Sequence, residues 1–173
     1  FSFKVFGARN IKNEINQKNV AFAIERSPDI AIDDGAEFIS VIYKKHENMA
    51  RKMLGGTEET TTGLHRLRSL EKEGLLKFPV IAVNYAQTKH FFDNRYGTGQ
   101  STIDGILRAT NILLAGKTFV VCGYGWCGKG LAARAKGMGC NVIVTEIDPV
   151  KALEAMMDGF QVMPVKKACR LAD

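Results

Sequence analysis

The chain has 173 residues, of which 46% are hydrophobic and 24% are charged, and it carries a formal net charge of +6 at pH 7. This composition is typical of a globular protein that forms one domain or parts of two. It holds no run of about 18 apolar residues, so we expect no membrane span, and its basic residues alternate with acidic ones, as in EKEGLLK and EIDPVKALE, so we expect no nucleic-acid partner.

The N-terminus and the cysteines indicate the cellular compartment of the protein. The segment FSFKVFGARN lacks the succession of charged, apolar and small residues of a signal peptide, and it lacks an initiator Met, so we expect a fragment of a longer cytoplasmic protein. The cysteines form no C-x-x-C pair, which favours a reduced compartment, and we expect no metal site. They are Cys122, Cys127, Cys140 and Cys169.

The first half of the chain shows strand and helix signals in alternation. Two short apolar runs, 30–32 and 78–83, predict buried strands, and the first ends at the turn-forming sequence DDG. Between them, leucines recur at the helical spacing of positions 64, 67 and 70. After Asn94 comes GTGQST, which suits a hinge or a cap, and then an amphipathic helix through 103–114 that we expect Gly116 to close.

The C-terminal third alternates strands and helices. Apolar runs predict strands at 118–122, 141–145 and 161–165. The first intervening helix ends near Lys136, and the second begins at Asp148-Pro149, where Asp148 caps the helix and Pro149 suits its first turn. This β-α-β-α-β order predicts a doubly wound parallel sheet, so the fold class is α/β.

The sequence VVCGYGWCGKG places a G-x-G-x-x-G loop between the first of these strands and its helix. Gly123 permits a tight turn, Gly125 lets a pyrophosphate approach the backbone, and Gly128 lets the helix pack closely. Glu146 follows about twenty residues later, where a carboxylate binds the adenosine ribose, so the loop predicts NAD rather than NADP. A structural glycine turn with a capping glutamate is the alternative, and Lys151 leaves NADP open.

Four separate motifs closely resemble the S-adenosylhomocysteine hydrolase (adenosylhomocysteinase) family, in its archaeal and deep-branching bacterial form. They are IDDG (32–35), GGTEETTTGLHRL (55–67), VNYAQTKHFFDNRYGTGQST (83–102) and VTEIDPVKALEAMMDGF (144–160). The resemblance implies part of an α/β substrate-binding domain through 1–97. It also implies a hinge helix and the first half of a Rossmann-like NAD-binding domain through 98–173.

The resemblance implies an NAD-dependent, reversible hydrolysis of S-adenosyl-L-homocysteine to adenosine and L-homocysteine. The substrate 3′-hydroxyl is oxidised, homocysteine leaves by elimination, water adds, and the ketone is reduced again. The family likeness also implies a cytoplasmic homotetramer of the methyl cycle in one-carbon metabolism. Three alternatives stay open: a hydrolase of S-inosyl-L-homocysteine, a non-catalytic regulatory relative that binds NAD, and an ordinary NAD-dependent dehydrogenase.

Four residues are the candidates for catalysis and substrate binding. Lys89 and Asp93 lie four apart, on one face of a helix, where a surface ion pair is the alternative reading. The resemblance makes Lys89 the base for the 3′-hydroxyl and makes Asp93 the group that holds this hydroxyl. It also makes Asp34, otherwise a turn residue, an acid or base near C4′ and C5′, and Glu59 a ribose contact.

By the same resemblance a larger set contacts NAD: Thr60, Thr61, Thr62, Asn94, Gly123, Gly125, Trp126, Cys127, Gly128, Lys129, Gly130, Glu146 and Lys151. Trp126 and Cys127 contribute their backbone, and otherwise we expect structural roles for them. The chain departs from the usual family pattern at three positions: Thr98 replaces a cysteine, Lys151 an asparagine, and Tyr85 an aspartate.

Overall fold

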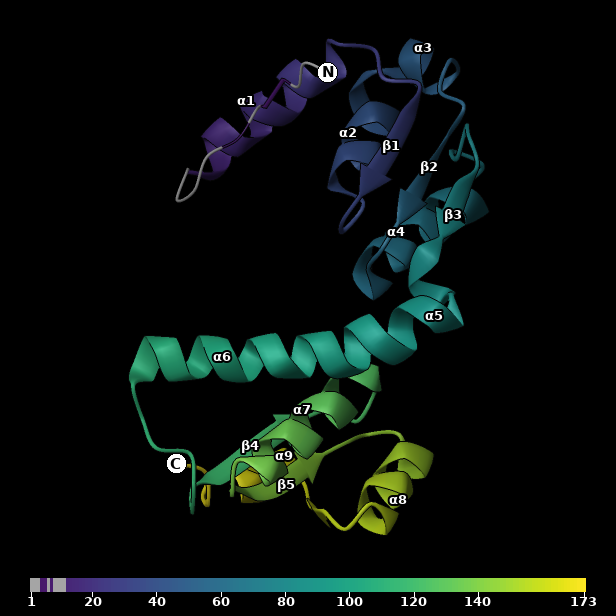
Figure 1. Ribbon diagram of the computed structural model, residues 1–173. Coiled ribbons are helices and arrows are strands. Elements are labelled where there is room, and N and C mark those ends of the chain that lie inside the picture. The colour runs from purple at the N-terminus through teal and green to yellow at the C-terminus, as the bar shows by residue number, and fades with distance from the viewer. Residues whose placement is uncertain (1–3, 6, 8–11) are drawn as a thin grey trace. The chain divides into compact units, whose positions relative to one another are not determined.

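The computed structural model describes residues 4, 5, 7 and 12–173. The chain divides into two compact units, Phe1–Tyr85 and Ala86–Asp173 (Figure 1). Each unit is built on a three-stranded sheet whose neighbouring strands are parallel, which confirms the α/β class.

The first unit has the sheet order β1-β2-β3. Its elements are α1 (Asn13–Ile24), β1 (Ile30–Asp33), α2 (Glu37–Lys45), α3 (Glu47–Ala50), β2 (Gly55–Glu58), α4 (Thr61–Lys72), β3 (Val80–Ala82) and the 3₁₀ helix η1 (Val83–Tyr85). Side chains of α2 and α4 form its core with Phe78, and two of the three leucines expected at helical spacing, Leu64 and Leu67, are buried there.

No local signal predicts strand β2, because glycine and glutamate rarely occur in strands. The structure explains the glycine. A Cβ on Gly56 would lie 3.3 Å from both the Ala31 carbonyl oxygen and Ile39 Cδ1, so a side chain at that position would require its neighbours to shift by a few tenths of an ångström. The strand expected at 78–83 is shorter than predicted, because the chain turns into η1 at Val83.

The second unit has the sheet order β4-β5-β6. Its elements are α5 (Gln87–Lys89), the π-helix η2 (His90–Gly97), α6 (Thr98–Thr110), β4 (Thr118–Cys122), α7 (Trp126–Gly137), β5 (Asn141–Thr145), α8 (Pro149–Met157), β6 (Gln161–Val162) and α9 (Val165–Ala168). Strands β4 and β5 confirm the predicted bounds, and Asp148 caps α8 as expected, with its carboxylate accepting the Val150 N–H at 2.9 Å.

Two predicted elements of this unit were wrong at their ends. Helix α6 ends at Thr110 rather than continuing to Leu114 and Gly116, because Asn111 takes the left-handed conformation that terminates helices. Leu114 is buried nevertheless. The strand expected at 161–165 stops at Val162, because Pro164 has no N–H for a ladder and instead precedes helix α9.

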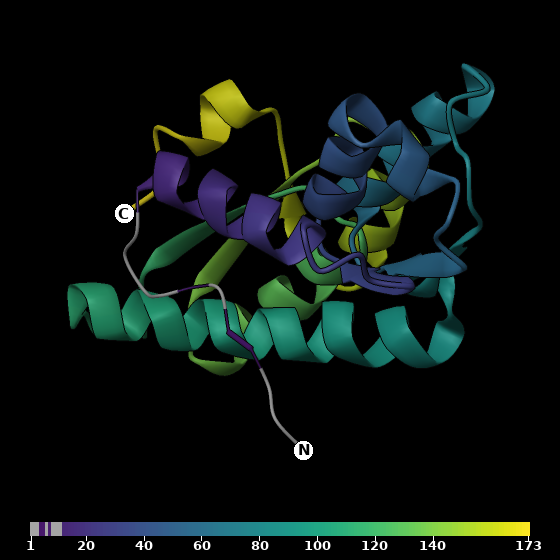
Figure 2. The same ribbon diagram turned by 90° about the horizontal axis from the view of Figure 1, so that it is seen from above.

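The segment η2–α6 is one continuous helical rod in both Figure 1 and Figure 2, and it crosses α7 at very short range. A Cβ on Gly99 would lie 2.7 Å from the Gly130 carbonyl carbon. A Cβ on Gly130 would overlap the Arg95 carbonyl oxygen. Glycine at these positions therefore lets the backbones of η2, α6 and α7 touch, and fixes η2 against the helix that follows the glycine loop.

We expect Gly130→Ala to destabilise the complete protein by about 1–3 kcal/mol, because the added methyl group has to push two backbones apart. Gly105→Ala is the matched control, since a Cβ at this α6 position meets nothing within 4 Å. Thermal denaturation of both variants measures the difference. Equal melting temperatures for the two variants would contradict the close packing described.

Candidate functional site

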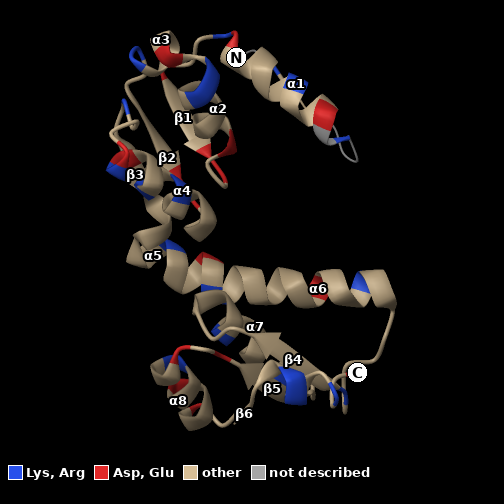
Figure 3. Cartoon of the chain, turned by 180° about the vertical axis from the view of Figure 1, so that it is seen from behind, with Lys and Arg blue, Asp and Glu red and all other residues tan. Residues whose placement is uncertain are grey.

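The carboxyl ends of β1 and β2 bring four acidic residues together. Asp33 and Glu58 are partners in the parallel register, so the residues that follow them, Asp34 and Glu59, leave neighbouring strands side by side. The Glu59 N–H donates to the Asp33 carbonyl oxygen at 3.3 Å. Asp34 and Glu59 are exposed, whereas Asp33 and Glu58 are buried. In Figure 3, Asp and Glu are red, and red positions lie at the end of β1. Of the four carboxylates at this edge, those of Asp34 and Glu59 are therefore accessible to a ligand and those of Asp33 and Glu58 are not.

The buried Glu58 carboxylate organises the loops at this edge. It accepts the N–H groups of Gly35 at 2.9 Å, Ala36 at 2.7 Å and Thr60 at 2.8 Å, and also the Thr60 hydroxyl at 2.7 Å. The Asp33 carboxylate caps helix α2 by accepting the Ile39 N–H at 2.8 Å. The sequence analysis did not identify Asp33 or Glu58 as functional. Their positions, directly before Asp34 and Glu59, are the signal that could have indicated them.

The predicted cofactor-binding threonines lie at the start of α4. Thr60 is the N-cap: besides donating to Glu58, its hydroxyl accepts the N–H groups of Gly63 and Gly35, each at 3.0 Å. A cofactor contact by this hydroxyl has to replace one of these bonds. The Thr61 hydroxyl accepts the Asn84 side-chain amide at 2.9 Å. Thr62 is exposed on the first turn of α4.

In the second unit, the structure brings Lys89, Asp93 and Asn94 together. Lys89 Nζ lies 3.1 Å from Asp93 Oδ2 and donates to Asn94 Oδ1 at 2.6 Å. Its side chain is 16% exposed, so this pair differs from an ordinary surface ion pair. The wide turn of the π-helix η2 places both the i+4 and the i+5 residue within reach of one ammonium group, and π-helical turns often occur at functional sites.

The glycine loop between β4 and α7 has the backbone that was predicted for it. Gly123 has φ +100°, a conformation that favours glycine, and a Cβ on Gly128 would overlap the Gly123 carbonyl oxygen. By contrast, a Cβ on Gly125 would meet no protein atom within 4 Å. Packing does not require glycine at position 125, so the open space there fits a ligand that approaches the backbone.

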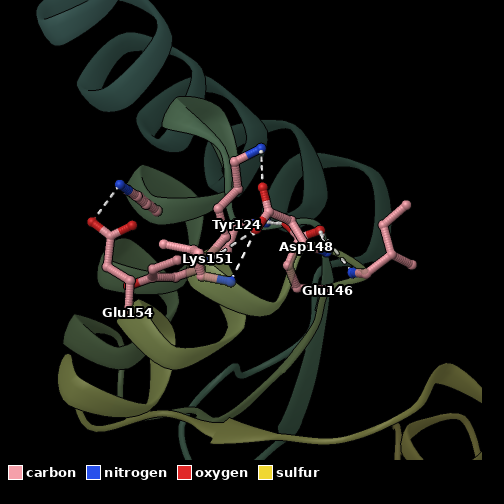
Figure 4. Close-up of polar contacts among 8 residues, drawn as sticks. Tyr124, Glu146, Asp148, Lys151 and Glu154 are labelled. Carbon is pink, nitrogen blue, oxygen red and sulfur yellow. Dashed lines mark hydrogen bonds and ion pairs between the residues drawn. The ribbon is translucent and has the colours of Figure 1, made fainter.

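Glu146 binds the backbone of this loop (Figure 4). One carboxylate oxygen accepts the Tyr124 N–H at 2.6 Å, and the other accepts the N–H groups of Ile147 at 2.7 Å and Asp148 at 3.0 Å. The N–H groups of Asp148 and Tyr124 hold the pKa of the Glu146 carboxyl below its ordinary value, although burial opposes them, and the Lys151 ammonium has a smaller effect. Lys151 lies 3.4 Å from the Asp148 carboxylate.

A cleft of about 830 Å³ opens at the carboxyl ends of β4, β5 and β6. Ligands of open α/β sheets bind at this edge. Acidic, small and apolar side chains line it: Cys122, Gly123, Thr145, Glu146, Ile147, Val162, Met163, Pro164 and Val165. The cleft, the open face of Gly125 and the Glu146 carboxylate together fit the adenosine and pyrophosphate of a dinucleotide.

Tyr124 is a further residue that sequence reasoning missed. It is 1% exposed, and its hydroxyl donates to Asp158 at 2.7 Å, which ties the glycine loop to the end of α8. Burial, and next the hydrogen bond to Asp158, raise the pKa of this phenol far above its ordinary value, so it stays protonated. An aromatic side chain between the first two glycines of a loop was the available signal.

The predicted cofactor residues at the start of α7 have protein contacts of their own. Lys129 pairs with Glu154, and its ammonium lies 4.8 Å from the centre of the Trp126 ring. The Trp126 ring packs against Phe91 at 4.8 Å between centroids. Gly130 faces the Arg95 backbone, and Cys127 is exposed. Cofactor contacts by these residues stay predictions.

Neither a metal site nor a membrane helix occurs in the part of the chain that the structure describes. Within it, no three histidine, cysteine, aspartate or glutamate residues are grouped as a metal site requires. Among its described residues, no helix combines the length and the apolar character needed to cross a membrane.

Residues 94–173 match the family model described as the NAD-binding domain of S-adenosyl-L-homocysteine hydrolase. Over all 173 residues the chain is 62% identical to the adenosylhomocysteinase of Aquifex aeolicus and covers 41% of it. Over 98% of its length it is 56% identical to the S-inosyl-L-homocysteine hydrolase of Methanocaldococcus jannaschii, again covering 41%. The chain thus spans about two fifths of the curated relatives it matches.

Among solved structures, a dipicolinate synthase chain of Bacillus halodurans superposes with a TM-score of 0.52 over 72% of this chain and 42% of that one. The two are 18% identical in sequence, so this likeness concerns the fold alone.

Glu146→Gln tests the carboxylate that holds the glycine loop. We expect the variant to be less stable than the wild type at neutral pH, because an amide cannot accept three N–H groups as well as a carboxylate. Because the pKa of Glu146 is lower in the folded state than in the unfolded state, its ionised carboxylate stabilises the folded protein at pH values above the unfolded-state pKa. The stability advantage of the wild type over the variant therefore shrinks as the pH falls below about 4.3. Melting temperatures of both proteins from pH 7 to pH 3 measure it. Equal melting temperatures of wild type and variant at pH 7, or a difference between them that is unchanged at pH 3, would contradict this role.

Proposed function

Because this chain belongs to the S-adenosyl-L-homocysteine hydrolase family, we propose that it is part of an enzyme that reversibly hydrolyses S-adenosyl-L-homocysteine to adenosine and L-homocysteine. The identity of 62% to an adenosylhomocysteinase, maintained over all 173 residues, is the observation that carries this proposal. The small-molecule substrate, a cytoplasmic location, a homotetrameric assembly and a place in the methyl cycle are parts of the same proposal.

The cofactor is NAD, and the residues of the second unit fit it. The glycine loop 123–128 and the first turn of α7 hold the pyrophosphate, and Glu146 holds the adenosine ribose. When bound, NAD supplies a reversible oxidation of the substrate 3′-hydroxyl, which acidifies the neighbouring C4′–H and lets homocysteine leave by elimination. The Glu146 carboxylate also disfavours the 2′-phosphate of NADP by repulsion between like charges.

Lys89 acts as the base on the substrate 3′-hydroxyl in this proposal. Its amine is held by Asp93 and Asn94, and a fixed general base contributes about 10²–10⁴-fold to the rate. Asp93 is 61% exposed, so its second carboxylate oxygen is accessible to hold the same hydroxyl. Asn94 takes the position between substrate and cofactor.

In this proposal Asp34 and Glu59 are the proton-transfer and substrate-binding residues of the first unit. Both are exposed carboxylates at the carboxyl edge of a parallel sheet, where a substrate can reach them. Asp34 moves the proton at C4′ and serves the leaving group at C5′. Glu59 binds the ribose hydroxyls. Asp33 and Glu58 do not touch substrate in this proposal, because both are buried.

Hydrolysis of S-inosyl-L-homocysteine is the second candidate, and the 56% identical relative of that name favours it. The two substrates differ at the purine 6-position, so one experiment separates them. The complete protein receives each substrate in parallel, and free homocysteine is measured. Release from the inosine compound alone selects the second candidate, and release from neither indicates a non-catalytic relative that binds NAD.

We expect Lys89→Met in the complete protein to lower kcat by about 10²–10⁴-fold, because the base is lost while the volume of the side chain is nearly kept. The NAD released on denaturation should stay equal to the wild type, since Lys89 does not hold the cofactor. Arg108→Met is the matched control: Arg108 forms an i,i+4 ion pair with Asp104 at 2.9 Å, but on an exposed face of α6. A Lys89→Met enzyme with wild-type kcat would refute the assignment of the base.

A further inference from the structure

We infer that Glu58 is a positioning residue, whose buried carboxylate sets Asp34 and Glu59 relative to each other for the reaction. This inference rests on the proposed function, because it gives the two exposed carboxylates their catalytic and substrate-binding roles. Glu58 itself touches no reacting atom, since it is fully buried.

The loop that carries Asp34 has a conformation that needs an anion. Gly35 has φ +82° and Ala36 has φ +54°, so two successive residues are left-handed, and the second is not glycine. Consecutive N–H groups in such a turn converge to form an anion-binding concavity, and a left-handed alanine costs energy that its surroundings have to offset. Here the Glu58 carboxylate fills the concavity, with Gly35 and Ala36 as donors.

The same carboxylate holds the loop that carries Glu59. It accepts the N–H and the hydroxyl of Thr60, the residue directly after Glu59. Residues adjacent to Asp34 and Glu59 therefore donate to a single group. The loop after β1 and the loop after β2 are joined through Glu58, and a shift of its carboxylate moves both.

The first turn of α4 packs directly against the Glu58 carboxylate. A Cβ on Gly63, in the first turn of α4, would overlap the carboxylate carbon and both oxygens. Glycine at position 63 thus makes room for this carboxylate, and the N-terminal end of α4 stabilises its negative charge. The Arg66 guanidinium, from the second turn, donates to the Gly35 carbonyl oxygen at 2.9 Å and supports the same loop from its other side.

Two variants of the complete protein displace this carboxylate by different means. Glu58→Gln keeps the size of the side chain but turns an NH₂ group toward one of the N–H donors, which breaks part of the network. Gly63→Ala keeps the charge and pushes the carboxylate away. Gly63→Ala preserves the fold most readily, because the overlapping atoms are the end of a flexible side chain, so it decides the question if Glu58→Gln does not fold.

Each variant has a matched control. Glu47→Gln changes a glutamate of the same unit that is exposed and pairs with Arg51. Gly105→Ala changes a helical glycine whose Cβ position faces open space. Neither control residue belongs to the proposed catalytic or binding set, so both should retain the wild-type kcat.

We expect kcat to fall by roughly a hundredfold in Glu58→Gln and Gly63→Ala, since a displacement near 1 Å has about this effect on catalysis. KM should change by a much smaller factor, and kcat per bound NAD should show the same fall. These readouts separate a positioning role from a role in folding. A kcat that falls only in proportion to the folded fraction or to bound NAD would overturn the inference. A wild-type kcat in both variants would overturn it as well. A wild-type protein that releases no homocysteine from either substrate refutes the proposed function instead, and the inference with it.

Discussion

In each unit, a carboxylate at the end of the second parallel strand accepts backbone N–H groups from the loop that follows the first strand. Glu58 does so for Gly35 and Ala36, and Glu146 does so for Tyr124. A tight loop at the end of a strand leaves N–H groups that no ladder satisfies, and an unpaired buried N–H costs about as much as a lost hydrogen bond. The carboxylates meet this need, and the geometry of both loops depends on them.

What these loops carry differs between the units. In the first unit the fixed loop begins with Asp34, which lies beside Glu59, and both residues are exposed. In the second it is the glycine loop, whose space at Gly125 suits a pyrophosphate. Contact between η2 and α7 through Gly130 packs the helix that carries Asp93 and Asn94 directly against the helix that follows this loop.

The sequence predicted the second unit better than the first. Local sequence signals were sufficient to predict β4, β5 and the cap of α8. Apolar runs form the two strands, and Asp148-Pro149 begins the helix, so each signal lies within a few residues of the element it predicts. Strand β2 was not predicted, because the contacts at its glycines come from residues distant in the sequence: Pro79 at Gly55, and Ala31 and Ile39 at Gly56. Of the site, the exposed acids and the Lys89 pair could be predicted from motifs. Glu58 and Tyr124 were missed, because donors or partners 22 or more residues away contribute to their roles.

In the proposed function, oxidation at C3′ of the ribose activates C4′ for elimination of the thiol. Hydrolysis by the complete protein in deuterated water tests it most directly, with the nucleoside product analysed by NMR. We expect deuterium at C4′, because this position exchanges its proton with solvent, and none at C3′, because that hydride leaves and returns without reaching water. Release of homocysteine with the original hydrogen still at C4′ would refute this reaction.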